Sequence, residues 1–477
     1  MGSFVENPAD QDHSSEKSQT KGVKLLLGDP KIAIRSLSLP MVVAMLIQTL
    51  YNIVDAFWVA GLGPDALAAI GFAFPFFFMA IGLSNGLGIG GGSAVSRWIG
   101  ARDKENADNV AIHTLVIMVI VAVAFTIPLF VFADQIFAVI GAGHVTELAV
   151  SYGRIIFLGT ILIFFTNIAY ALLRGEGDVK RAMYAMLVSA GLNIILDPIF
   201  IYSFGMGVAG AAWATVISLG VTSLFMLYWM AIKRDTYVSL KIADFSFDKY
   251  ILWDILRVGI PASVIQISMA ITMLIMNVLI VMVASTDGVA VYSIGWRVVM
   301  VAITPLLAIA TAVVSVCGAS YGAHLFRKTE IAHLYATKIG FLIGTGVAIG
   351  TYILAPQIAA IFTFSEATAH IAPDLAQFFR IVSLFYPAVA FGMFSSSLFQ
   401  GTGKGMYSLI VTILRTLILA TLLSVLCAFY LGMGLEGIWW GLVGGNTIGS
   451  IVGFIWARYY MKKLLSGDES RHTVPAP

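Results

Sequence analysis

Long apolar stretches recur along the whole chain, and they constrain the fold more than any other feature. Each has about 20 or more residues, enough for a helix to cross roughly 30 Å of hydrocarbon. They lie near 37–62, 66–96, 110–133, 148–173, 182–204, 207–232, 251–284, 288–320, 331–355, 373–399, 406–430 and 435–461. A membrane barrel would need short alternating segments instead. The sequence therefore predicts an all-α integral membrane protein with twelve transmembrane helices.

Composition agrees with a membrane protein and argues against several other classes. Of the 477 residues, 59% are hydrophobic and 11% are charged, whereas soluble domains are roughly a quarter charged. A net charge of +2 without a basic patch gives no reason to expect a nucleic-acid partner. The sequence offers no metal-ligand cluster or nucleophile–base pair, so we expect neither an enzyme nor a cofactor. Membrane lipids are the surroundings that this composition predicts.

Lysine and arginine occupy every second connection between the predicted spans. They lie in 17–35, 97–104, 174–181, 233–249, 327–328, 404 and 458–463. The other six connections, near 63–66, 134–147, 203–209, 285–288, 356–372 and 431–436, contain none. Because basic residues favour the cytoplasmic side, we expect a multi-pass protein of the cell membrane with both termini in the cytoplasm.

The two halves of the chain resemble each other at a spacing of about 220 to 227 residues. Equivalent positions are Pro40 and Pro261, Gly175 and Gly401, and Gly207 and Gly434. Six helices in each half would give two pseudo-symmetric lobes with the same topology, a parallel repeat. Such duplications usually serve a central cleft that opens to each side in turn, so the repeat favours a transporter.

The repeat and the charge pattern together predict the domain organisation. We expect a mobile cytoplasmic tail at 1–29, a first lobe at 30–232, a charged cytoplasmic linker at 233–250, a second lobe at 251–464 and a cytoplasmic tail at 465–477. Because one chain contains both lobes, we expect a monomer to function.

Two acidic residues, Asp55 and Asp197, each interrupt a long apolar run in the first half. Hydrocarbon makes an ionised carboxylate costly, so such residues usually mark an ion or proton pathway. The equivalent positions in the second half hold Met276 and Leu423. The site is therefore expected in the first lobe alone.

Both acids lie at a similar depth, about 10 Å inside the outer surface. Tyr51 precedes Asp55 by four residues and Asn193 precedes Asp197 by four, so each pair shares a helix face. Thr215 lies at similar depth in the sixth span. We expect these five residues to form one pocket for H⁺ or Na⁺, with a sodium ion held by Asp55, Asn193, Asp197 and Thr215. The alternative is that buried donors merely pair with the two acids.

Arg297 and Arg415 are basic residues inside spans of the second half. Arg415 lies near the middle of its span, where a charge is costly. Either residue could line a central cavity, and the sequence leaves this open, although a structural role is favoured for Arg415.

Three segments carry a resemblance to a known family: QTLYNIVD at 48–55, LRGEGD at 173–178 and LNIILDP at 192–198. They resemble the multidrug and toxic compound extrusion (MATE) family, most closely archaeal members of its DNA-damage-inducible branch. The likeness extends from Gly28 to the last span.

This resemblance implies a V-shaped exporter of cationic or amphipathic organic compounds, driven by inward H⁺ or Na⁺ through alternating access. It carries the coupling site of the family onto the five pocket residues and adds Asn167, although Asn167 lies nearer the cytoplasmic side. Small amphipathic cations are the substrates that it implies. A lipid-linked saccharide flippase of the same superfamily is the alternative, since Arg297 and Arg415 could contact a pyrophosphate.

Overall fold

The computed structural model describes residues 20–233, 235–241, 245–364 and 368–472, and its regular elements are helices. The first half contains α2 (Lys21–Leu27), α3 (Pro30–Ala60), α4 (Pro64–Gly100), α5 (Lys104–Val131), α6 (Ala133–Val139), η1 (Gly143–Val145), α7 (Thr146–Leu158), α8 (Thr160–Gly175), α9 (Val179–Pro198), η2 (Ile199–Ser203), α10 (Gly207–Leu227) and η3 (Tyr228–Lys233). The second half contains α11 (Lys249–Gly322), α12 (Phe326–Ile353), α13 (Ala355–Phe362), η5 (Ala369–Ile371), α14 (Ala372–Ser383), α15 (Tyr386–Gly401), α16 (Gly405–Ile413), η6 (Leu414–Leu419), α17 (Ala420–Val425), η7 (Leu426–Tyr430) and α18 (Gly434–His472).

Among the described residues, ten helical segments are long and apolar enough to cross a membrane, and two bent pairs bring the number to twelve. The bent spans are the fourth, 143–175, and the tenth, 369–401, with bends of 46° and 52°. The twelve predicted spans are therefore confirmed. The bends lie at equivalent positions of the two halves, so the repeat extends to the shape of the backbone.

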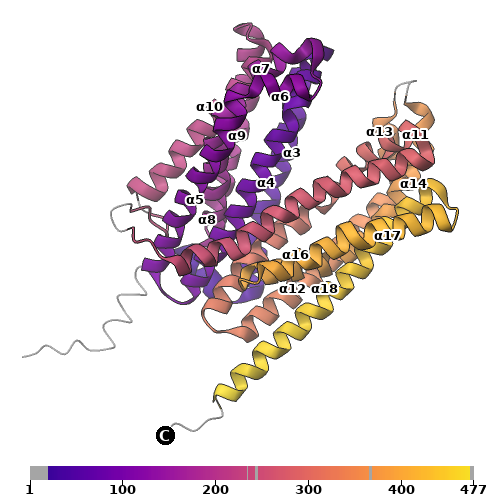
Figure 1. The fold of residues 1–477 in the computed structure, drawn as a ribbon. Coiled ribbons are helices and arrows are strands. Elements are labelled where there is room, and N and C mark those ends of the chain that lie inside the picture. The colour runs from indigo at the N-terminus through magenta and orange to yellow at the C-terminus, as the bar shows by residue number, and fades with distance from the viewer. Residues whose placement is uncertain (1–19, 234, 242–244, 365–367, 473–477) are drawn as a thin grey trace, which may run out of the picture.

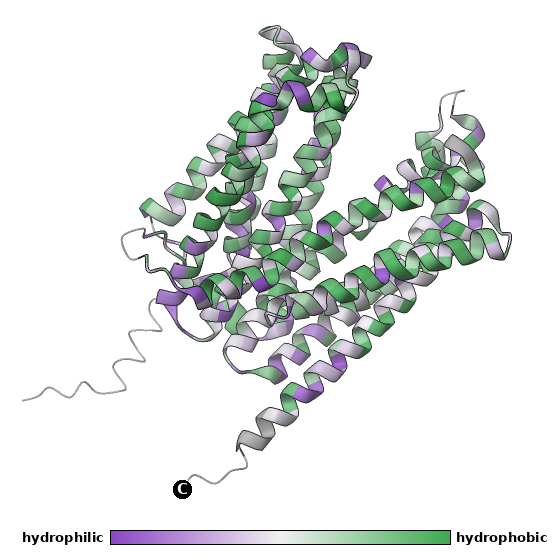
Figure 2. Ribbon diagram, viewed as in Figure 1, coloured by the Kyte–Doolittle hydropathy of each residue, from purple (hydrophilic) through white to green (hydrophobic). Residues whose placement is uncertain are grey.

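The helices gather into two bundles, α3 to α10 and α12 to α18, with α11 running from the foot of the first into the second (Figure 1). The bundles meet at the end that carries the basic connections, here called the basic end, and diverge toward the opposite, open end. Figure 2 shows hydrophobic residues along most of the helices, with hydrophilic residues gathered mainly near their ends. The lobe boundaries at 30–232 and 251–464 stay a prediction.

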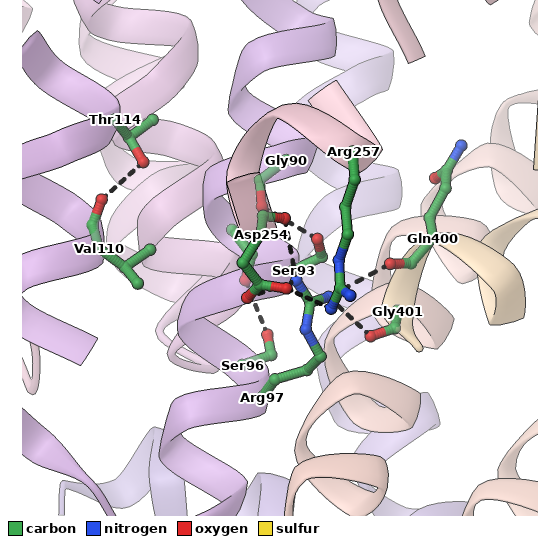
Figure 3. Close-up of polar contacts among 11 residues, drawn as sticks. Gly90, Ser93, Ser96, Arg97, Val110, Thr114, Asp254, Arg257, Gln400 and Gly401 are labelled. Atoms are coloured by element: carbon green, nitrogen blue, oxygen red, sulfur yellow. Dashed lines mark hydrogen bonds and ion pairs between the residues drawn. The ribbon is translucent and has the colours of Figure 1, made fainter. Parts of the chain in front are cut away.

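A buried ion pair joins the two bundles at the basic end (Figure 3). Nη2 of Arg97 on α4 lies 3.0 Å from Oδ2 of Asp254 on α11, and both residues are buried. Nη1 of Arg97 donates to the carbonyl oxygen of Gly401 at 3.0 Å. Asp254 also pairs with Arg257. The contact therefore ties α4, α11 and the end of α15 together.

Glycines let α4 and α11 pack backbone against backbone beside this pair. A Cβ on Gly100 would lie 2.0 Å from the carbonyl oxygen of Ala319, and one on Gly322 would lie 1.9 Å from that of Arg97. A Cβ on Gly90 would lie 2.5 Å from another α11 carbonyl oxygen. Small residues of this kind permit close helix approach in membranes, so the bundles fit tightly at the basic end.

Parts of the two segments expected as tails are helical. Thr20 caps α2 by accepting a hydrogen bond from the Val23 amide, and α2 buries Val23 and Leu26. Nζ of Lys328, in the second half, donates to the Leu27 carbonyl at 2.8 Å. At the other terminus α18 continues to His472. Residues 1–19 and 473–477 lie outside the described residues.

The segment expected as a linker docks on the basic end of the first bundle. The Val238 amide donates to Oε2 of Glu176 at 2.7 Å, and Asp108 accepts further hydrogen bonds from the segment. Near α11 the Asp248 amide donates to Nε2 of His113 at 3.0 Å. Carboxylate and imidazole side chains of the first bundle therefore accept hydrogen bonds from backbone amides of the segment that precedes α11.

Glu176 provides a test of this docking through pH. Burial raises the pKa of Glu176 to about 8, from an ordinary value of 4.5. Between these values the folded protein keeps a proton that the unfolded chain releases, so the stability should fall as pH rises. Glu176→Gln stays neutral and should escape this fall, melting roughly 2–4 °C above the wild type near pH 9.

The measurement is thermal unfolding of the purified protein across about pH 5 to 9. Glu147→Gln, which removes an exposed carboxylate from the same bundle, should leave the pH dependence unchanged. If Glu176→Gln followed the wild-type curve across the whole range, the buried proton would not contribute to stability.

Candidate functional site

Two helices of the first bundle bring an acid close to the open end. Asp55 lies about one and a half turns before α3 ends at Ala60. Asp197 comes directly before Pro198, and the π-helical η2 begins at Ile199. Proline lacks an amide hydrogen, and π-turns often occur at functional positions. The backbone is thus irregular where Asp197 projects from it.

The carboxyl groups of Asp55 and Asp197 lie within hydrogen-bonding reach of each other. Asp197 is fully buried and Asp55 is half-buried. Among the described residues, no donor reaches Oδ1 of Asp197. A hydrogen bond between two carboxyl groups needs a proton on one of them, and a bound cation could take that place. The pair is therefore suited to holding one proton or one cation.

Asn193 fixes the position of Asp197 from one helical turn away. With its amide nitrogen facing the acid, Nδ2 donates to Oδ2 of Asp197 at 2.8 Å. The amide oxygen then faces Thr215 on α10, 3.3 Å from its hydroxyl and 3.2 Å from its amide nitrogen. Asn193 and Thr215 are both buried. The amide thus connects α9 with α10 and orients the carboxylate.

Two tyrosines complete the surroundings of the acid pair. Tyr51, one turn before Asp55 on α3, lies close to Thr215 and to both acids. Tyr152 on α7 also lies close to both acids. Tyr152 was absent from the sequence prediction, yet counting its depth from the basic-free end of the fourth span would have found it.

Asn167 lies in a different place from the other five predicted residues. Its Nδ2 donates to the hydroxyl of Ser84 on α4 at 3.1 Å and to the Ile163 carbonyl at 3.0 Å. In the described part of the chain, no hydrogen bond joins Asn167 to Asp55 or Asp197. The structure thus brings five of the six predicted residues together. Asn167, on α8, contacts α4 instead.

Among the residues that the structure describes, the second bundle carries no equivalent acid pair. The equivalent position on α11 is the buried, apolar Met276, and Leu423 takes the other. Arg415 is buried and Arg297 is exposed. Within the described ranges, no group of three or more His, Cys, Asp or Glu side chains could hold a metal ion. A cation in the first bundle would therefore depend on carboxylate, amide and hydroxyl oxygens.

Membrane-spanning helices in two similar halves, with an acid pair in one half, are typical of a membrane transporter. The family comparison agrees with this. The MatE family model matches the chain twice, at 40–199 and at 261–426, once in each half. The chain belongs to the MatE family.

Known relatives match nearly the whole chain. The multidrug export protein MepA of Staphylococcus aureus (strain N315) is 28% identical over 446 residues, which cover 92% of this chain and 95% of MepA. A solved MOP superfamily transporter from Pyrococcus furiosus Vc1 (DSM3638) is 48% identical, with a TM-score of 0.90 over 94% of this chain and 99% of its own. An outward-facing multidrug resistance MATE family transporter is also 48% identical, with a TM-score of 0.91 and the same coverage of both chains.

A double-mutant cycle tests whether Asn193 acts through Asp197. Asn193→Leu leaves a buried carboxylate without its donor, so we expect a loss of about 1–3 kcal/mol in unfolding free energy. In an Asp197→Leu background that carboxylate is gone, and Asn193→Leu should cost clearly less. The measurement is reversible unfolding of the four proteins in detergent.

A matched cycle between Asn193 and the exposed Asp65 should be additive to within about 0.5 kcal/mol, because these residues share no partner. Additive costs in the cycle with Asp197 would show that the amide does not support the acid.

Proposed function

We propose that this protein is a multidrug efflux antiporter that exports amphipathic organic cations in exchange for H⁺ or Na⁺. The pairing of Asp55 with Asp197 inside the first bundle carries the proposal. Membership of the MatE family and similarity to MepA, a multidrug export protein, support the direction of transport and the kind of substrate.

The coupling ion would bind between Asp55 and Asp197. Two adjacent carboxylates repel each other, so one proton or one sodium ion between them is electrostatically favourable. For Na⁺, the Asn193 amide would turn its oxygen toward the acids, and Thr215 would supply a hydroxyl oxygen, while Tyr51 shields the pocket from one side. Asn167 would have a positioning role, because it ties α8 to α4.

The proposed conformation is outward-facing. The basic connections favour the cytoplasm, which assigns both termini to that side of the plasma membrane and the open end to the outside. The buried pair of Arg97 and Asp254 closes the cytoplasmic side in this state. Ion binding at the acids would change the packing of α3, release the substrate and permit the return to an inward-facing state. Both bundles belong to one chain, so a monomer would suffice.

A lipid-linked saccharide flippase is less well supported than an exporter. Such a protein needs a basic cavity for the pyrophosphate, whereas Arg415 is 6% exposed and lies inside the second bundle. Of these two arginines, only Arg297 is exposed. The acid pair would oppose an anionic substrate, which again favours an exporter of cations.

Proteoliposomes with ΔpH and ΔNa⁺ imposed separately test the proposal. The readout is export of a fluorescent amphipathic cation, and the gradient that drives it identifies the coupling ion. Asp55→Asn and Asp197→Asn should each lower driven export at least about tenfold. A neutral amide can neither take up and release a proton nor balance the charge of a bound sodium ion. Folded protein should remain in the membrane.

Asp65→Asn is the matched control, because it removes an exposed acid from the open end of the same bundle. It should transport like the wild type. Full transport by both buried-acid variants would refute the assignment, and movement of lipid-linked saccharide without drug-dependent ion flux would favour the flippase.

A further inference from the structure

A cavity of about 450 Å³ lies in the second bundle, away from the acid pair. α14 and its C-cap residue line it with side chains that share one helix face: Pro373, Gln377, Arg380, Ile381 and Leu384. Tyr352, the next-to-last residue of α12, and Trp440 on α18 complete the lining. Figure 1 shows α14 near the open end of the second bundle. The cavity therefore lies between three membrane-spanning helices at that end, and its volume is within the range of small-molecule sites.

The lining changes from polar to apolar with depth in the membrane. α14 begins at the open end, so Gln377 and Arg380 lie nearer the surface than the exposed Leu384 does. Tyrosine and tryptophan, here Tyr352 and Trp440, are typical of the level of the lipid headgroups. Helical side chains lean toward the N-terminus of their helix, so the long side chain of Arg380 extends its guanidinium toward this level. The cavity thus combines a cation at headgroup level with an apolar surface below it.

Arg380 differs from its counterpart in the first bundle in having no acid partner. By the repeat it is equivalent to Arg154, which pairs with Asp134 on α6. α6 begins with ADQI and α13 begins with APQI, so Pro356 takes the place of Asp134. Arg380 is exposed, and no ion pair of the described residues includes it. The second bundle therefore keeps the arginine without its carboxylate, and the cavity lies beside that arginine.

We infer that this cavity binds an amine-bearing phospholipid from the leaflet at the open end, with the lipid phosphate on Arg380. A guanidinium matches the oxygens of a phosphate with paired hydrogen bonds. Basic pockets between membrane-spanning helices bind lipid headgroups in this way. An acyl chain of the lipid would lie against the apolar lower part of the lining.

Glu436 determines the kind of headgroup that fits. Its Oε1 accepts a hydrogen bond from Nε2 of Gln377, which lines the cavity. α18 begins at Gly434, so Glu436 lies about one turn nearer the open end than Trp440 does. In phosphatidylethanolamine the ammonium group likewise lies on the water side of the phosphate. The carboxylate would attract this ammonium and repel a headgroup that carries only negative charge. The site lies in the second bundle, so it is independent of the proposed acid pair.

Thermal unfolding of the purified full-length protein in detergent tests the proposal, with dihexanoyl phosphatidylethanolamine as the probe. The wild type should gain stability in a saturable manner. Arg380→Gln should weaken the apparent affinity about tenfold, the effect of a hydrogen bond to a charged group. Arg154→Gln is the matched control and should keep the wild-type affinity, because that arginine has its own acid. Phosphatidylglycerol of the same chain length should bind more weakly, and Glu436→Gln should reduce this difference.

A structure of the wild type in nanodiscs of phosphatidylethanolamine and phosphatidylglycerol provides a second test that does not depend on folding of the variants. Density for one headgroup should contact Arg380. Inorganic phosphate alone should give no thermal gain, because it has no chain to bury. No gain from phosphatidylethanolamine in the wild type, an equal gain in Arg380→Gln, or an equal gain from inorganic phosphate would overturn the proposal. Equal affinity for phosphatidylglycerol, or no lipid density at Arg380, would overturn it as well.

Discussion

The cost of burying a charge away from water governs how this structure is organised. Arg97 and Asp254 solve the problem within the chain, because they neutralise each other where the two bundles meet. Asp55 and Asp197 do not solve it, since two acids together leave an excess of negative charge. The first contact joins the two bundles at the basic end, and the second is the place that we propose for a mobile ion.

The two halves have similar backbone conformations but differ in the charged residues inside their spans. Gly177 and Gly403, equivalent by the repeat, have φ angles of +82° and +76°, values that glycine adopts easily. The fourth and tenth spans bend at matching places. Only the first half carries the acid pair, while the second carries Arg415. Duplication thus provides the kind of symmetric scaffold that rocking bundles need, and the proposed ion site lies in one half of it.

Much of this could be predicted from the sequence, because hydrophobic length and charge alternation determine spans and depth. Depth counting correctly grouped Asp55 with Asp197 and Thr215, because residues at the same depth on neighbouring helices lie near one another. Asn167 joined the predicted group through the family resemblance alone, because depth counting had placed it nearer the cytoplasmic side, and in the structure its hydrogen bonds go to Ser84 and Ile163. The contact of Arg97 with Asp254 joins residues far apart in the chain, and nothing in either local segment indicates it.

The central claim is that ion and substrate movements are linked through the acid pair. Its most direct test is to impose a gradient of an amphipathic cation alone across proteoliposomes and to record the movement of H⁺ and Na⁺. The account predicts that the substrate gradient drives one of these ions uphill in the opposite direction, and that Asp197→Asn abolishes this flux. Substrate movement without any opposing ion flux in the wild type would contradict it.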